Sequence, residues 1–302
     1  MQKIIECVPN FSEGRNLKVI REIFKSAEKI KSARVFELEY NKDHNRCLFT
    51  IVGAPSDVSA SVFEAIKTAA KLIDMNKHHG EHPRIGAADV IPFIPVSGVS
   101  IKECVLLSNK LAKKVADELK IPVFMYEASA KKPENRNLAN VRKGEYEGLK
   151  ERMSRGAGSG FARKKPDYGP NRIHPTAGAT VIGARKYLIA FNVNLDTPDM
   201  VITKKIASKI REKDGGLKGV KALGFSVGGH GQVSMNLVDF GKTNFDEAYR
   251  VIEKEARKLG VKIKNAEIYG MIPLEALVCA VRTAFKADTF KSSQVLEKRL
   301  YE

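Results

Sequence analysis

The order of strands and helices predicted from the sequence is the same in both halves of the chain, and this repetition constrains the fold most strongly. In the first half, short apolar runs predict strands at residues 4–9, 34–39, 46–52 and 90–96, with helices that begin near Leu17 and Pro55. Ser100 and Glu103 predict a capping box at the start of a third helix. In the second half, strands are predicted at residues 187–195, 221–227, 232–240 and 264–270, with helices at 201–210 and 245–259. Each half therefore has the order β-α-β-β-α-β, which is the split-βαβ pattern of ferredoxin-like sheets.

This repetition predicts an α+β fold of two ferredoxin-like βαββαβ subdomains, at residues 1–178 and 179–302, with a ligand cleft between them. The segment 154–178 is rich in Gly, Pro, Arg and Lys, a composition typical of a linker. It lacks the Gly-Lys-Ser/Thr ending of a phosphate loop. Clefts between two α/β units are common ligand sites, so we expect this connector to cross one.

A cluster of histidines marks the first half as the place of chemistry. His78, His79 and His82 make up half of the six histidines in the chain. Gly80 and Pro83 are unfavourable in a helix, so we expect the cluster to lie on a loop of the first subdomain. The second half has only a few residues at the equivalent place, and a long insertion in a small unit is usually functional. The residues of this loop therefore predict general acid–base catalysis on a polar substrate.

Within the loop, His82 is the best candidate for proton transfer. It follows Glu81, which could orient the ring, and it precedes Pro83, which stiffens the backbone. His78 and His79 either contact an anionic substrate or lie at the end of the preceding helix, and the second alternative is favoured. Residues 78–82 also match the H-x-x-E-H pattern of one zinc-peptidase group. That pattern requires a continuous helix and a third ligand. We therefore expect no metal.

The charge and the cysteines restrict the partners and the compartment. The net charge of +17 fits either a polyanionic ligand or a Lys-rich surface. The positive residues are spread over the predicted helices without a basic arm, so we expect no nucleic-acid partner. The four cysteines are far apart, which favours a reduced, cytoplasmic protein, and no apolar run is long enough to cross a membrane.

Seven segments together resemble the formiminotransferase family. They are ECVPNFSEGR at 6–15, DHNR at 43–46, LIDM at 72–75, GEHPRIGA at 80–87, RKGEYE at 142–147, DYGP at 167–170 and GARKYLIAFNVNL at 183–195. The resemblance implies transfer of a formimino group from N-formimino-L-glutamate to N5 of tetrahydrofolate, a step of histidine degradation and one-carbon metabolism. It also implies folate, with or without a polyglutamate tail, in the cleft between the subdomains, and a homodimer.

The resemblance also implies roles for particular residues. His82 aligns with the catalytic histidine of the family, with Glu39 and Glu267 as supporting carboxylates. Arg84 and Arg46, with His44 beside them, are expected to bind the carboxylates of the substrates. The residues expected to bind tetrahydrofolate are Gly169, Pro170, Asn171, Arg172, Ile173, His174, Pro175, Thr176, Ala177 and Gly178.

The expected mechanism uses one imidazole twice. N5 of tetrahydrofolate must lose a proton when it attacks the amidine carbon, and the departing glutamate nitrogen must gain one. Such proton transfer contributes ~10²–10⁴-fold. Orientation of the two substrates should contribute more. Transfer of a formyl group, a formimino-glycine donor, and a non-catalytic basic RNA-binding protein remain as alternatives.

Overall fold

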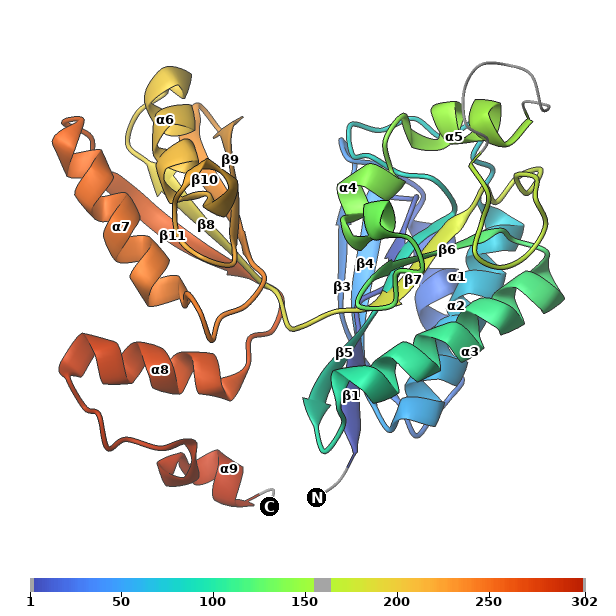
Figure 1. Cartoon of the computed structure of the whole chain (residues 1–302), viewed down its shortest axis with the longest axis horizontal. Coiled ribbons are helices and arrows are strands. Elements are labelled where there is room, and N and C mark those ends of the chain that lie inside the picture. The colour runs from blue at the N-terminus through green and yellow to red at the C-terminus, as the bar shows by residue number, and fades with distance from the viewer. Residues whose placement is uncertain (1–2, 155–163, 301–302) are drawn as a thin grey trace. The chain divides into compact units, whose positions relative to one another are not determined.

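The apolar runs of the first half assemble into one mixed sheet. The fold is described from a computed structural model, which covers residues 3–154 and 164–300 (Figure 1). The strands of this sheet are β1 (Ile4–Cys7), β2 (Asn10–Phe11), β3 (Arg34–Asn41), β4 (Arg46–Gly53), β5 (Ala88–Ser97), β6 (Val123–Glu127) and β7 (Thr180–Ala184). Neighbouring strands in the order β3-β4-β1-β5 pair antiparallel, and the short β2 pairs antiparallel with β4 and β5. In contrast, β7 lies parallel to both β5 and β6.

Three amphipathic helices bury their apolar sides against the first sheet. They are α1 (Leu17–Ala27), α2 (Pro55–Leu72) and α3 (Ile101–Leu119), shown together on the right of Figure 1. Pro55 opens α2, as predicted. The predicted capping box of α3 is confirmed, since the Ser100 hydroxyl accepts from the Glu103 amide and the Glu103 carboxylate accepts from the Ser100 amide.

Two shorter helices cover the β6 side of the sheet with a separate apolar cluster. They are α4 (Leu138–Val141) and α5 (Glu145–Ser154), after the 3₁₀ turn η1 (Pro133–Arg136). Their apolar side chains pack on Phe124 and Tyr126 of β6. Because α5 begins with glutamates, this cluster also brings carboxylates close to the histidine loop.

The second half forms an antiparallel sheet with the strand order β11-β8-β10-β9. Its strands are β8 (Ile189–Leu195), β9 (Val220–Val227), β10 (His230–Leu237) and β11 (Ile263–Tyr269). Helices α6 (Met200–Ile210) and α7 (Phe245–Lys258) supply the apolar residues that pack on this sheet. The remaining elements are η2 (Glu212–Asp214), α8 (Leu274–Phe285), η3 (Ser292–Gln294) and α9 (Leu296–Leu300).

The predicted α+β class and the order of the main elements are confirmed, but the sequence did not predict β7. The chain divides into the units Met1–Arg185 and Lys186–Glu302, so the division lies after Arg185 and not after Gly178. The reason is that Thr180–Ala184 is buried throughout and pairs with two strands of the first sheet. Such a continuous apolar run is typical of a parallel strand that is covered on both faces. Among the described residues, no helix is long and apolar enough to cross a membrane.

Candidate active site

The turn between β3 and β4 supports the histidine loop. Asn45 in this turn is buried, with 7% of its surface exposed, and has a φ angle of 47°. Asparagine tolerates this left-handed conformation better than most residues. Its side-chain Oδ1 accepts from the Gly14 amide at 2.9 Å, and its Nδ2 donates to the His79 carbonyl at 2.9 Å. The turn is thereby tied to two other segments of the first unit.

The histidine loop lies directly against this turn. The Glu81 amide donates to the Asp43 carbonyl at 3.1 Å. At Gly80, an added Cβ atom would lie 2.4 Å from the His44 carbonyl oxygen, so this position excludes side chains. The residues 78–82 contain no helix, which confirms the prediction of a loop.

His78 is part of the packing of the loop. Its Nε2 donates to the Asn45 carbonyl oxygen at 2.9 Å, and its Nδ1 accepts from Nε of Arg84 at 3.2 Å. Burial lowers the pKa of this imidazole, which agrees with a neutral ring whose two nitrogens have opposite roles. The favoured interpretation of His78 and His79 as residues at a helix end is wrong, because α2 ends at Leu72.

Arg84 joins the loop to α5. Its guanidinium donates to Glu145 at 2.5 Å and to the two carboxylate oxygens of Glu147 at 2.6 and 2.9 Å. Burial by itself lowers the pKa of Arg84, but the hydrogen bonds and charges of the two glutamates outweigh it and raise that pKa. The sequence did not identify these partners, although both lie in the RKGEYE segment of the family resemblance. The predicted substrate ligand Arg84 is therefore engaged within the first unit.

His82 is half-buried beside Arg46. Its Nε2 accepts from Nη1 of Arg46 at 2.5 Å. Because a guanidinium can only donate, this contact assigns the ring proton to Nδ1. Nδ1 is buried and, among the described residues, has no hydrogen-bond partner. Burial, followed by the charges of Arg46, Arg142 and His44, lowers the pKa of His82 to about 3.

Arg46 is a half-buried cation that lacks a carboxylate partner in the described parts of the chain. Burial and the charge of Arg142 lower its pKa, whereas Asp89 and Glu39 act in the opposite direction. Asp89 itself is 1% exposed, accepts from the Ile85 amide at 2.8 Å and is ion-paired with Arg142. Sequence reasoning missed this buried ion pair beside the site.

The structure brings four predicted site residues together in one small pocket. His44, Arg46, His82 and Arg84 line it, and the His44 and His82 rings are 5.9 Å apart. The remaining lining residues are Ser12, Asn45, His78 and Asp89. These imidazole and guanidinium groups favour a ligand that carries negative charge.

The two predicted supporting carboxylates belong to different units. Glu39 lies on β3 opposite Leu48, and burial, followed by the charge of Glu37, raises its pKa. Glu267 lies on β11 of the second unit. Its carboxylate accepts from Asn194 Nδ2 at 3.2 Å, Gln232 Nε2 at 3.4 Å and the Tyr269 hydroxyl at 3.2 Å.

The last part of the predicted folate-binding connector runs along residues 85–87, which lie between the histidine loop and β5. The Ala87 amide donates to the Ala177 carbonyl at 2.9 Å, and the Ala179 amide donates to the Ile85 carbonyl at 3.0 Å. The His174 side chain shapes this turn, because its Nδ1 accepts from the Ala177 amide at 3.0 Å. The residues from Gly169 to Thr176 are exposed or half-buried.

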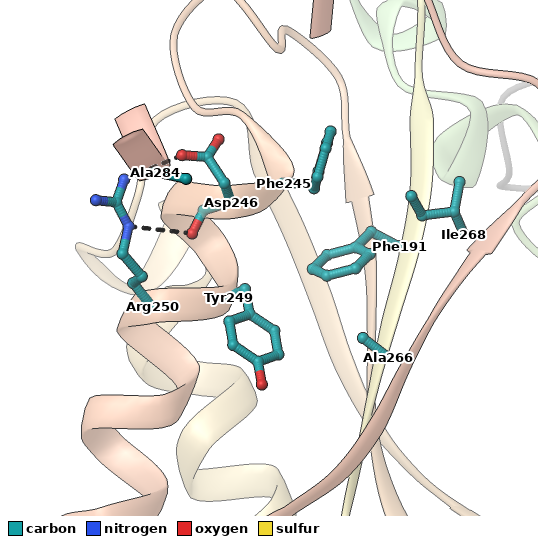
Figure 2. Close-up of a pocket in the computed structure, with 8 residues that line it drawn as sticks. All are labelled: Phe191, Phe245, Asp246, Tyr249, Arg250, Ala266, Ile268 and Ala284. Atoms are coloured by element: carbon teal, nitrogen blue, oxygen red, sulfur yellow. Dashed lines mark hydrogen bonds and ion pairs between the residues drawn. The ribbon is translucent and has the colours of Figure 1, made fainter. Parts of the chain in front are cut away.

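A larger cavity in the second unit has a different character. It has a volume of about 410 Å³ and contains the Asp246–Arg250 ion pair (Figure 2). Its lining residues are Phe191, Phe245, Asp246, Tyr249, Arg250, Ala266, Ile268 and Ala284. Because aromatic and aliphatic groups dominate and no imidazole lines it, the pocket around His82 is the better candidate for proton transfer.

The described ranges contain no group of three or more His, Cys, Asp or Glu residues arranged to hold a metal ion. The cysteines are free; Cys7, Cys47 and Cys104 are buried and Cys279 is partly exposed.

Two family models match the chain. The N-terminal subdomain of the formiminotransferase domain matches residues 4–185, and the formiminotransferase domain matches residues 190–298. A glutamate formimidoyltransferase from Streptococcus pyogenes serotype M1 is 43% identical and covers 99% of both chains. One from Thermoplasma acidophilum is 41% identical, over 98% of this chain and 97% of the relative. The formimidoyltransferase-cyclodeaminase of Rattus norvegicus is 40% identical over 96% of this chain, which spans 54% of that protein.

Proposed function

Because the chain belongs to the formiminotransferase family, we propose that it has the activity of a glutamate formimidoyltransferase. The reaction moves the formimino group of N-formimino-L-glutamate to N5 of tetrahydrofolate and releases glutamate, a step of histidine degradation. The observation that carries this proposal is the full-length similarity to the glutamate formimidoyltransferases.

His82 acts in this proposal as the general base and acid. Burial and the charges of Arg46 and Arg142 lower the pKa of His82 to about 3, so the ring is neutral and has a nitrogen free of a proton, but it is a weak base in this state. The N5 amine attacks the formimino carbon, a bond from N5 to that carbon forms, and the N5 proton passes to the imidazole. The bond from that carbon to the glutamate nitrogen then breaks as the imidazole returns the proton to this nitrogen. The products are 5-formimino-tetrahydrofolate and glutamate, so atoms and charges balance.

Arg46 connects substrate binding to the basicity of His82. The guanidinium donates to the Nε2 atom that has to accept the proton. A substrate carboxylate is the counter-ion that Arg46 lacks, and an ion pair with it would draw the guanidinium from the imidazole. Loss of this neighbouring positive charge would raise the pKa of His82 towards the range in which a histidine transfers protons efficiently.

The other residues extend the site. Glu39, whose pKa is raised, and Glu267 stabilise the amidinium form of the donor. The connector 169–178 binds the folate, and His44 and Arg84 bind or support the carboxylate groups. The mechanism itself needs no metal, because His82 supplies both proton transfers. The net charge of +17 suits polyglutamylated folate.

The finer architecture and setting are also part of the proposal. The strand order β11-β8-β10-β9 supports a ferredoxin-like second unit, and β3-β4-β1-β5 supports the same pattern in the first. We propose a cytoplasmic homodimer with folate bound in a cleft between these subdomains.

A His82→Gln variant tests the proposed function. Glutamine can still accept a hydrogen bond from Arg46, but it cannot carry a proton between two nitrogens. We expect the variant to lose roughly 10²–10⁴-fold in turnover and to keep its affinity for tetrahydrofolate. Product formation is measured by absorbance with formimino-glutamate, formimino-glycine and formyl donors in parallel. Retained turnover in the variant would refute the role of His82, and activity of the wild-type protein only with a formyl donor would refute the reaction.

A matched control is His230→Gln in the second unit. The His230 imidazole lies at the start of β10 and contacts Lys264. This substitution removes an imidazole outside the His82 pocket, so we expect turnover within about twofold of the wild-type value.

A further inference from the structure

We propose that Asn45 is a positioning residue that holds His82 in its reactive place. This inference rests on the proposed role of His82. No catalytic or binding role is predicted for Asn45. Its backbone carbonyl and its side chain both form hydrogen bonds within the first unit.

The contacts between the turn and the loop form a continuous ladder. Each residue from 78 to 82 meets the turn at residues 43–46: the His78 ring and the His79 carbonyl bond to Asn45, Gly80 packs on the His44 carbonyl and Glu81 bonds to Asp43. At the end of the ladder, the His82 ring meets Arg46. The position of His82 therefore depends on the turn through several short contacts in succession.

Asn45 bonds to three separate partners. Its Oδ1 accepts from the Gly14 amide, its Nδ2 donates to the His79 carbonyl, and its own carbonyl accepts from the His78 ring, each at 2.9 Å. Replacing it by aspartate would keep an acceptor but remove the donor, and glycine would keep the φ angle of 47° but remove both. Only asparagine combines this backbone conformation with one acceptor and one donor on a short side chain.

The contacts also separate a positioning role from a general structural one. The backbone acceptor for His78 remains in every substitution at position 45, and the apolar core around Phe49 and Ile51 on β4 is not touched. The side-chain bonds reach only the segments before α1 and before His82. Loss of these two bonds should therefore let the loop shift without unfolding the sheet.

The test is a double-mutant cycle of Asn45→Gly with His82→Gln in the full-length protein. In the wild-type background, we expect Asn45→Gly to lower kcat roughly 10²-fold, the loss that a displacement of about 1 Å can cause, with KM for both substrates within about threefold. In the His82→Gln background the same substitution should change kcat by less than about twofold, because its effect acts through the missing imidazole. Long incubations at high protein concentration make the residual rates measurable.

Two further variants keep the test decisive. Asn45→Asp keeps the acceptor for the Gly14 amide, removes the donor to His79 and adds a negative charge, so it replaces Asn45→Gly in the cycle only if that variant folds poorly. Ser61→Ala removes the buried hydrogen bond from the Ser61 hydroxyl to the Ala27 carbonyl in the same unit and should lower the melting temperature without lowering kcat.

Unchanged kcat in the Asn45 variants, or an equal loss in both His82 backgrounds, would overturn the inference. If His82→Gln alone keeps full turnover, the proposed function of His82 fails instead, so the two failures are distinguishable.

Discussion

The neutral imidazole of His82 predicts a specific loss of stability in acid. Its pKa is lowered to about 3 in the folded protein, whereas an unfolded chain has a histidine pKa of about 6.5. At pH values between about 3 and about 6.5, the unfolded chain binds a proton at His82 that the folded protein does not bind. The contribution of this group to stability is therefore largest above about pH 6.5 and is lost as the pH falls towards about 3.

The magnitude follows from the width of this window. Each pH unit below about 6.5 costs up to about 1.4 kcal/mol, so a fall to about pH 4.5 costs at most roughly 2.7 kcal/mol. Because the ring is partly accessible, solvent reduces this value. We expect roughly 1–2 kcal/mol between neutral pH and about pH 4.5.

The assay compares the wild-type protein with His82→Gln, which has no proton to bind at this position. Urea unfolding followed by circular dichroism at both pH values gives the loss of stability for each protein. The difference between the two losses isolates His82 from other groups, such as His78, whose pKa is also lowered. Equal losses in both proteins, or an NMR titration of the His82 ring near pH 6.5, would refute the reasoning.

Three further predictions concern other parts of the first unit and the cysteines. Gly86→Ala should destabilise the protein by about 1–3 kcal/mol in thermal unfolding, because the new Cβ atom would lie 1.9 Å from the Ala179 carbonyl oxygen and separate the connector from the loop. Ser100→Ala should cost about 1 kcal/mol, by the same measurement, and leave turnover unchanged, because it removes only the cap of α3. A thiol reagent should label Cys279 first in the native protein, as located by mass spectrometry, because the other three cysteines are buried and burial raises their thiol pKa. Early labelling of a buried cysteine would contradict this order.

Local periodicity predicted the elements that have regular, one-sided patterns. The helix that Pro55 opens and the Ser100–Glu103 capping box follow from signals within a few residues, and both are present. The histidine loop was also predictable, because Gly80 and Pro83 exclude a helix. These features depend on residues that are close together in the chain, so a single sequence is enough to predict them.

The features that the sequence did not reveal depend on distant partners. β7 is a short apolar run whose neighbours, β5 and β6, come much earlier in the chain, so nothing local marks it as part of the first sheet. Arg84 looked available for a substrate, because its partners Glu145 and Glu147 lie on a helix far along the sequence. Asn45 looked like an ordinary turn residue for the same reason.

The ladder between the β3–β4 turn and residues 78–82 has a consequence for ligand affinity. Fixing the backbone of one residue costs about 1–2 kcal/mol of conformational entropy, so immobilising five residues on binding would cost roughly 5–10 kcal/mol. Here the loop is already ordered by contacts with the folded turn, and this entropy is lost when the chain folds. The free energy of substrate contacts at His82 is thus preserved for affinity and orientation instead of being consumed in ordering the protein.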